Sequence, residues 1–263
     1  MENLQKTEYY LQGSGLKSAY LFHEGDGPVH IFLPGYMSDM SGSKASAIWQ
    51  YCTTNKHACL LFDYSGCGQS DGEFQHASLS IWCEEILELI AHICPHRRYY
   101  FIGSSMGGWL MLLLAQAIQE RSGKYAIAGL IGIAAAPDFT SWGYNDAQKQ
   151  EIMQNGVVYE ENPYGPEPTP MWQKFWLDGE NNKQFEGHIN IHAPIYLLHG
   201  MADADVPYDI SIKLAEAVGS ANVQLYLVKD GDHRLSRDED ISLLIETLHK
   251  LNGCPAHDKN SPI

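Results

Sequence analysis

A serine set between glycines is the residue of this chain best suited to chemistry. The stretch Gly103-Ser104-Ser105-Met106-Gly107 follows the apolar run 99–102 and precedes a second apolar run that begins at Trp109. The first run predicts a buried strand and the second a helix, so Ser105 is expected at a tight, strained turn between them. Glycines are expected beside it because a side chain there would collide with the neighbouring strand and helix. Such a turn exposes the Ser105 hydroxyl next to a helix N-terminus, whose dipole favours negative charge.

Two later segments contain the partners that a serine nucleophile needs. A serine hydroxyl is a weak nucleophile at neutral pH, and it requires a base that is oriented in turn by a carboxylate. Asp203 follows the predicted strand 195–198, and His233 follows the predicted strand 223–228. Their order along the chain, serine, then aspartate, then histidine, matches a known arrangement of nucleophile, acid and base. We therefore predict Ser105 as the nucleophile, Asp203 as the acid and His233 as the base.

Other acidic residues and histidines leave alternatives to this assignment. Asp138 follows a predicted strand and is the second candidate for the acid, whereas Asp205 is expected to cap the helix that follows it. His188 and His192 are four residues apart, but no acidic third ligand is evident, so we expect no metal site. The reaction of an activated serine also requires no cofactor.

Predicted strands and helices alternate along most of the chain. Buried strands are expected at 29–33, 58–62, 99–102, 126–133, 195–198 and 223–228. Helices are expected after the serine turn and at about 44–54, 79–94, 209–218 and 238–251. This alternation predicts an α/β fold with a mostly parallel central sheet and helices on both faces. We expect a single domain over 1–263 whose chemistry lies at the carboxyl ends of the strands.

The stretch 138–190 differs in character from the rest of the chain. It contains closely spaced prolines, many aromatic residues and little periodicity. We expect it to be a small cap or lid inserted into the fold. Trp172, Trp176 and Tyr164 are the candidates for lining an acyl pocket above Ser105. The alternative is that these aromatic residues only attach the cap to the core.

Motifs over nearly the whole chain resemble those of the serine α/β-hydrolases. HGMADADVP resembles the acid loop of that family, which places the acid at Asp203, and GDH resembles its histidine motif. FLPGYMSDMSGSKA, FDYSGCGQSDG and GSSMGGWLMLLLA are similar to the branch that contains the mitochondrial palmitoyl-protein thioesterase and acyl-glucuronide esterase, with its bacterial relatives. The resemblance implies the α/β-hydrolase fold. One departure is Pro34-Gly35-Tyr36, where many members have His-Gly, but the branch shares this change.

Two backbone N–H groups, those of Tyr36 and Met106, are expected to form an oxyanion hole, and such donors are typically worth ~3 kcal/mol each. We therefore expect a serine hydrolase that cleaves a carboxylic ester or acyl thioester through an acyl-enzyme intermediate. Its substrate would be a small molecule or an acylated protein. A peptidase or amide hydrolase with the same triad, and a non-catalytic binding protein of this fold, are the alternatives.

Charge and composition restrict the partners and the location. The formal net charge is −15, without a Lys/Arg cluster, so nucleic acid and anionic membrane surfaces are poor candidate partners. The six cysteines form no C-x-x-C pair, which favours a reducing compartment. MENLQKTEYY has no apolar or Arg-rich targeting character, and no apolar run reaches membrane-spanning length. These features predict a cytoplasmic protein.

Overall fold

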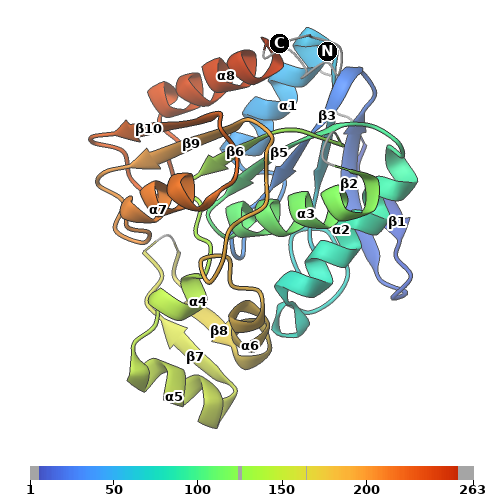
Figure 1. Ribbon diagram of the computed structural model, residues 1–263. Coiled ribbons are helices and arrows are strands. Elements are labelled where there is room, and N and C mark those ends of the chain that lie inside the picture. Colours follow the sequence, from blue (N-terminus) through green and yellow to red (C-terminus); the bar gives the residue numbers. More distant parts are fainter. Residues whose placement is uncertain (1–5, 124–125, 164, 254–263) are drawn as a thin grey trace.

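An eight-stranded sheet forms the centre of the molecule (Figure 1). The computed structural model describes residues 6–123, 126–163 and 165–253. The strands lie side by side in the order β1-β2-β4-β3-β5-β6-β9-β10. Their bounds are β1 Glu8–Leu11, β2 Lys17–His23, β3 Asp26–Leu33, β4 His57–Phe62, β5 Tyr99–Ser104, β6 Ile127–Ile133, β9 Ile195–Gly200 and β10 Val223–Val228. β1 and β2 are antiparallel to their neighbours, and the pairs from β4 to β10 are parallel.

Helices cover both faces of this sheet. On one face lie α1 (Ser43–Asn55) and α8 (Asp238–Gly253), which pack side by side in Figure 1. On the other lie α2 (Leu79–Ile93), α3 (Met106–Ser122) and α7 (Asp209–Ala217). Each face therefore encloses its own apolar core, and the predicted α/β-hydrolase architecture is confirmed.

The central strands are apolar throughout because both of their faces are covered. In β5, Tyr99 and Phe101 belong to the core on the α3 side, whereas Tyr100 and Ile102 belong to the core on the α1 side. Successive side chains of a strand point to opposite faces, which explains this alternation. The strand is thereby held on both sides, and the residue that follows it is placed firmly at the sheet edge.

The start of α2 is stabilised by a side-chain cap. The hydroxyl of Ser78 accepts a hydrogen bond from the backbone N–H of Ile81 at 3.3 Å, so Ser78 caps α2. A short 3₁₀ helix, η1 (Phe74–His76), precedes it.

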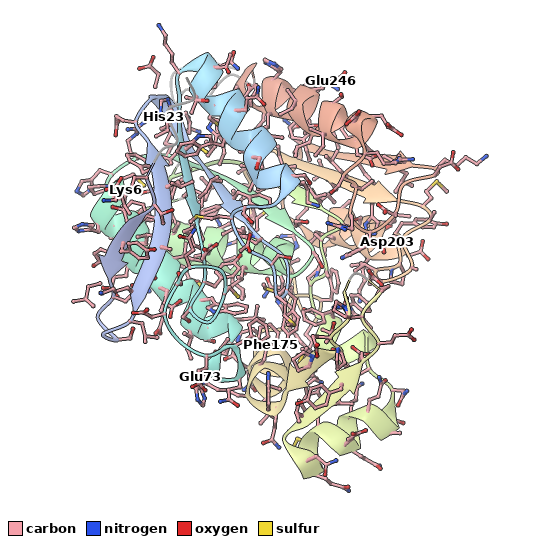
Figure 2. The ribbon with its side chains drawn as sticks, turned by 180° about the vertical axis from the view of Figure 1, so that it is seen from behind. Lys6, His23, Glu73, Phe175, Asp203 and Glu246 are labelled. Atoms are coloured by element: carbon pink, nitrogen blue, oxygen red, sulfur yellow. The ribbon has the colours of Figure 1, made fainter. Side chains whose placement is uncertain are left out.

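The segment 139–181 forms regular elements outside the central sheet. These are α4 (Phe139–Trp142), α5 (Asp146–Asn155), the antiparallel pair β7 (Val157–Glu160) and β8 (Thr169–Trp172), and α6 (Gln173–Asn181). In Figure 1 they lie together beyond one edge of the sheet, coloured yellow-green to brown. Figure 2 shows Phe175 of α6 where this segment meets the rest of the molecule, and its side chain is buried there.

Candidate active site

Ser105 lies at the turn that the sequence predicts. β5 ends at Ser104, α3 begins at Met106, and Ser105 between them has φ 54° and ψ −121°. A residue other than glycine in such a conformation is strained, and strain of this kind is concentrated at functional sites. A Cβ atom on Gly107 would lie 2.1 Å from the carbonyl oxygen of Leu33, and one on Gly103 would lie 2.3 Å from that of Gly107. Glycine is therefore needed on both sides of the serine.

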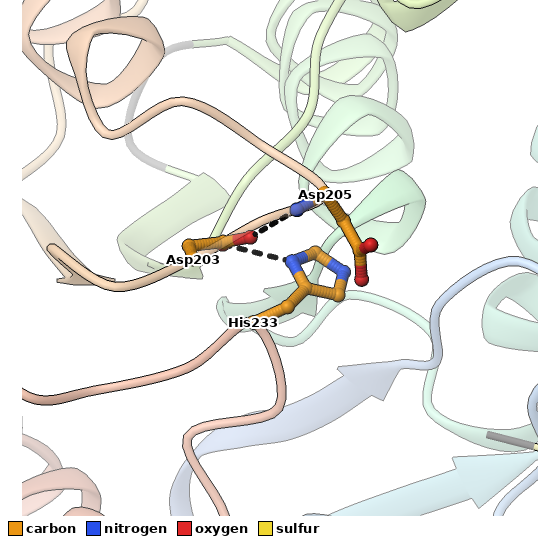
Figure 3. Close-up of side chains that lie close together, drawn as sticks. All are labelled: Asp203, Asp205 and His233. Carbon is orange, nitrogen blue, oxygen red and sulfur yellow. Dashed lines mark hydrogen bonds and ion pairs between the residues drawn. The ribbon is translucent and has the colours of Figure 1, made fainter. Parts of the chain in front are cut away.

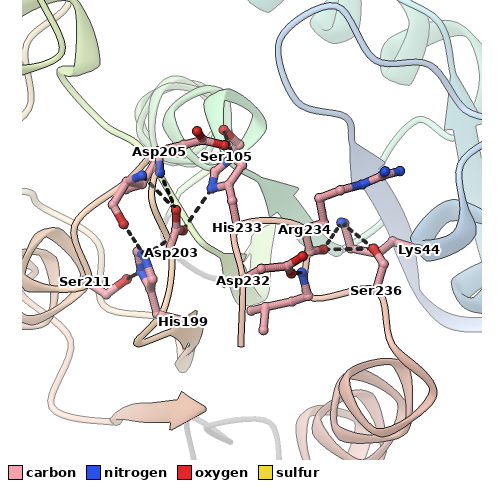
Figure 4. A network of polar contacts seen from close by, with 12 residues as sticks. Lys44, Ser105, His199, Asp203, Asp205, Ser211, Asp232, His233, Arg234 and Ser236 are labelled. Atoms are coloured by element: carbon pink, nitrogen blue, oxygen red, sulfur yellow. Dashed lines mark hydrogen bonds and ion pairs between the residues drawn. The ribbon is translucent and has the colours of Figure 1, made fainter. Parts of the chain in front are cut away.

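His233 connects Ser105 to Asp203. Its Nε2 lies 3.0 Å from the Ser105 hydroxyl oxygen, and its Nδ1 lies 2.9 Å from Oδ2 of Asp203. With Nδ1–H donating to the carboxylate, Nε2 of the neutral ring is left as an acceptor facing the serine hydroxyl. This is the tautomer that a general base requires. The three residues come from the loops after β5, β9 and β10, and Figure 4 shows them converging.

The Asp203 carboxylate is buried and well supplied with donors. Its Oδ1 accepts hydrogen bonds from the backbone N–H groups of Asp205 at 2.9 Å and Val206 at 2.8 Å. Its Oδ2 lies 2.9 Å from Nδ1 of His233 and 3.2 Å from Nε2 of His199. Burial alone would raise the pKa of Asp203, but the hydrogen bonds from the two histidines and from Val206 hold that pKa well below its usual range. The carboxylate is therefore ionised at neutral pH.

The two alternative aspartates have other partners. The carboxylate of Asp138 accepts hydrogen bonds from the backbone N–H groups of Gln184 at 2.7 Å and Phe185 at 2.8 Å. It thereby fastens the chain where the 139–181 segment returns to the sheet. Asp205 does not cap the following helix, because α7 begins after Tyr208 and has no side-chain cap.

Asp203, Asp205 and His233 offer ligand atoms that lie within 4.8 Å of one another, and Figure 3 shows the three side chains together. Histidine nitrogen and carboxylate oxygen are ligands that zinc accepts. However, both oxygens of Asp203 already accept hydrogen bonds, and Nδ1 of His233 donates to one of them. These contacts fit an acid–base pair better than a metal site.

The two predicted oxyanion donors lie beside Ser105. Met106 is the first residue of α3, so its N–H has no partner within the helix. A Cβ atom on Gly35 would lie 3.4 Å from Cβ of Ser105, which shows how closely the turn before Tyr36 approaches the serine. Both Tyr36 and Met106 line the cleft above Ser105.

This cleft has a volume of about 720 Å³ and contains Ser105 and His233. Its aromatic lining consists of Phe32, Tyr36, Phe139, Trp142 and Tyr144. Lys44 and Arg234 also line it.

The prediction that Trp172 and Trp176 line the pocket is wrong. Among the residues that the structure describes, neither lines this cleft. Trp172 is held in the β7–β8 pair opposite Val157, and Nε1 of Trp176 donates to the carbonyl oxygen of Thr140 at 3.0 Å. Tyr164 lies outside the described residues. The lining aromatic residues of this segment are instead Phe139, Trp142 and Tyr144, which come from its beginning.

Lys44 and His199 are polar residues of the site to which no sequence pattern assigned a role. Lys44 donates from Nζ to the carbonyl oxygen of Arg234 and, at 3.3 Å, to the hydroxyl of Ser236. Burial, and to a lesser extent the nearby Arg234 charge, lower the pKa of Lys44 to about 8. His199 could have been suspected from the sequence, because it is the first residue of the HGMADADVP motif. It is fully buried, however, and its position in a strand does not distinguish a functional histidine from a core residue.

A serine, an aspartate and a histidine in this chain order at the strand ends of a parallel sheet are characteristic of the α/β-hydrolases, and the chain belongs to that family. A family model described as "Serine aminopeptidase, S33" matches residues 29–155. Within the family, the chain falls in the branch of the mitochondrial palmitoyl-protein thioesterase ABHD10. The human protein of that name is 37% identical over 237 residues, which cover 89% of this chain and 76% of the human one. The chain is thus a hydrolase.

Solved structures support the same branch. A putative hydrolase from Agrobacterium vitis S4 is 36% identical, with a TM-score of 0.87 over 94% of this chain and 98% of that one. Mouse ABHD10 is 33% identical, with a TM-score of 0.85 and the same two coverages.

The predicted cytoplasmic location is contradicted by these relatives, because the human, orangutan and bovine proteins are all named as mitochondrial. The prediction rested on the composition of residues 1–10 and on the spacing of the cysteines. Targeting signals are short segments that receptors read, so the composition of a folded domain does not determine them. Over the described part of the chain, no helix has the length and apolar character needed to cross a membrane.

Proposed function

We propose that this protein hydrolyses acyl thioesters or carboxylic esters through an acyl-enzyme formed on Ser105. The observation that carries the proposal is the chain of contacts from Ser105 through His233 to Asp203, with distances of 3.0 Å and 2.9 Å. These contacts open onto the cleft, so a substrate carbonyl can reach the serine.

In the first half of the reaction, the Ser105 oxygen attacks the carbonyl carbon while Nε2 of His233 takes the hydroxyl proton. The Asp203 carboxylate stabilises the imidazolium that results. The amides of Tyr36 and Met106 donate to the oxyanion of the tetrahedral intermediate. As this intermediate collapses, the bond to the leaving thiol or alcohol breaks and His233 returns the proton to that group.

Water completes the cycle by the same route. His233 takes a proton from water as the water oxygen attacks the acyl-enzyme carbonyl. As the second intermediate collapses, the bond between the acyl carbon and the Ser105 oxygen breaks, His233 returns its proton to that oxygen, and the carboxylic acid is released.

The preference for thioesters or esters is supported by the relatives, which are named palmitoyl-protein thioesterases. It is also supported by the aromatic wall of the cleft, since apolar contact favours an acyl chain. The substrate is accordingly an acylated small molecule or an acylated protein. We further propose that 138–190 acts as a cap over Ser105, with Phe139, Trp142 and Tyr144 as its contacts to the acyl group.

A peptidase with the same triad is the second candidate, because the matching family model is described as a serine aminopeptidase. Hydrolysis rates of a thioester, an ester and an amide that share one acyl group distinguish the two. We expect the thioester and ester to be cleaved much faster than the amide. A faster amide would favour the peptidase, and the absence of any turnover would favour a binding protein.

The same assay identifies the nucleophile. Ser105→Ala should lose both turnover and labelling by a fluorophosphonate probe, whereas Ser104→Ala, which removes the neighbouring hydroxyl, should retain both. Labelling that persists in Ser105→Ala would contradict the proposed acyl-enzyme.

A further inference from the structure

A second histidine lies behind the Asp203 carboxylate. His199, near the end of β9, is fully buried, and its Nε2 lies 3.2 Å from Oδ2 of Asp203. Figure 4 shows the row that results, running from Ser211 through His199 and Asp203 to His233. Asp203 thus lies between two imidazole rings, only one of which belongs to the proposed relay.

The contacts of His199 determine which of its nitrogens donates. Nε2 lies 3.0 Å from the carbonyl oxygen of Val206 as well as 3.2 Å from Asp203. Both of these neighbours are acceptors, so Nε2 must carry a hydrogen whichever charge the ring has. Nδ1 lies 2.7 Å from the hydroxyl of Ser211, which is fully buried in α7. Because a hydroxyl can donate or accept, this contact holds the ring in place in either charge state.

The Nε2–H of His199 is one of four donors that surround the buried Asp203 carboxylate. Asp203 has a side chain with 0% exposure, so water cannot replace a missing donor. Oδ1 is held by two backbone N–H groups, while Oδ2 is shared by His233 and His199. Removing the His199 donor would leave Oδ2 held by His233 alone, and the carboxylate would be freer to rotate away from that ring.

We propose that His199 is a positioning residue for the reaction: its Nε2–H, shared between the Val206 carbonyl oxygen and Oδ2 of Asp203, keeps the Asp203 carboxylate aimed at His233. This inference rests on the proposed function, since it assumes that Asp203 orients the base. His199 does not touch the substrate, because it lies behind Asp203 and does not line the cleft. It should therefore act on turnover and not on substrate binding.

Kinetics of three variants test the proposal. His199→Leu removes the donor and should lower kcat by ~10- to 100-fold, by analogy with the loss of the hydrogen-bonding partner of a metal-ligating side chain, with KM within about twofold. His199→Gln keeps an amide N–H at a similar distance from the backbone and should recover most of kcat. Ser211→Ala keeps the ring but removes its support, and should lower kcat by a smaller factor.

A remote buried histidine provides the matched control. His30 is also fully buried, and its ring nitrogens lie 3.1 Å from the carbonyl oxygen of Ala58 and 3.0 Å from Nδ2 of Asn252. His30→Leu should lower the thermal stability as His199→Leu does, but leave kcat unchanged.

Three outcomes would overturn the role of His199. They are a kcat within twofold of wild type in His199→Leu, an equal loss in the Leu and Gln variants, and an equal loss of kcat in His30→Leu. The Ser105→Ala variant separates this failure from failure of the proposed function. If Ser105→Ala is inactive while His199→Leu is fully active, only the role of His199 is wrong. If Ser105→Ala remains active, the proposed function is wrong as well.

Discussion

The carboxyl edge of the sheet and the 139–181 segment border the same cleft, but they hold their side chains by different means. At the sheet edge, hydrogen bonds to charged or polar atoms hold each group, as in the four donors around Asp203. In the segment, aromatic packing adds to the hydrogen bonds: the Phe175 ring lies 5.0 Å from that of Tyr36 and 6.0 Å from that of Phe139, while Nε1 of Trp142 donates to the carbonyl oxygen of Pro137 at 2.8 Å. Hydrogen bonds fix direction, whereas apolar contacts mainly fill space. We infer that the edge performs the chemistry and that the segment selects the acyl group.

The largest expected effect lies at the sheet edge. Asp203→Asn should lower kcat by ~10⁴-fold, because the amide cannot stabilise the His233 imidazolium or fix its tautomer. Asp138→Asn is the matched control, since Asp138 is also buried and bonded to two backbone N–H groups. It should lower the stability with little effect on kcat. Equal losses of kcat in the two variants would contradict the assignment of the acid.

The next effect concerns acyl selection by the segment. Burial of one methylene group contributes ~0.8 kcal/mol to binding. Removing a cleft-lining side chain that covers about two methylenes should therefore lower kcat/KM for a long acyl chain roughly tenfold. We expect this loss in Trp142→Ala with an octanoyl ester, while acetyl ester turnover is preserved.

Trp172→Ala is the control for that measurement, because its side chain is half-buried in the segment but does not line the cleft. It should leave the dependence on acyl length intact. A flat wild-type profile from acetyl to octanoyl would show that the segment does not select acyl chains.

Tyr36 contacts both regions, and removing its hydroxyl is expected to have a smaller effect on kcat. Its hydroxyl donates to the carbonyl oxygen of Pro170 at 2.8 Å, while its backbone N–H belongs to the proposed oxyanion hole. Tyr36→Phe keeps the ring packing but loses one neutral hydrogen bond, worth ~1 kcal/mol of stability, so kcat should fall by at most about fivefold with KM unchanged. Tyr20→Phe, which loses a hydroxyl contact with Glu8 at the β1–β2 end of the sheet, should leave kcat unchanged. An equal kcat in the two variants would show that the two regions are not coupled through Tyr36.

The smallest effect concerns the charge of Lys44. Burial lowers the pKa of Lys44 to about 8 in the folded protein, against 10.5 as the ordinary value. The unfolded chain therefore binds more protons between these pH values, and the stability of the wild type should rise with pH across that interval. Urea unfolding at pH 7.5 and pH 10 should show a gain relative to Lys44→Met on the order of 1 kcal/mol. A stability difference that stays constant with pH would mean that Lys44 is not desolvated.

The sequence alone predicted the fold and the serine turn, because both depend on local rules. Gly103 and Gly107 beside Ser105 indicate the turn, and the alternation of strands and helices indicates a parallel sheet whose strand ends gather at one edge. Asp203 and His233 could be proposed because each follows a predicted strand. Their roles remain predictions, although the structure brings both next to Ser105.

The neighbours of these residues could be recognised only in the folded chain. Ser105 and His233 are 128 residues apart in the chain, and Tyr36 and Pro170 are 134 apart, so no periodicity relates them. The periodicity of apolar residues indicates which face of a helix or strand is apolar, but it does not indicate which other element packs against that face. For this reason the sequence pointed to Trp172 and Trp176 where the cleft is lined by Phe139, Trp142 and Tyr144. It also left His199 unnoticed, since a buried donor can be recognised only by the acceptor that packing brings beside it.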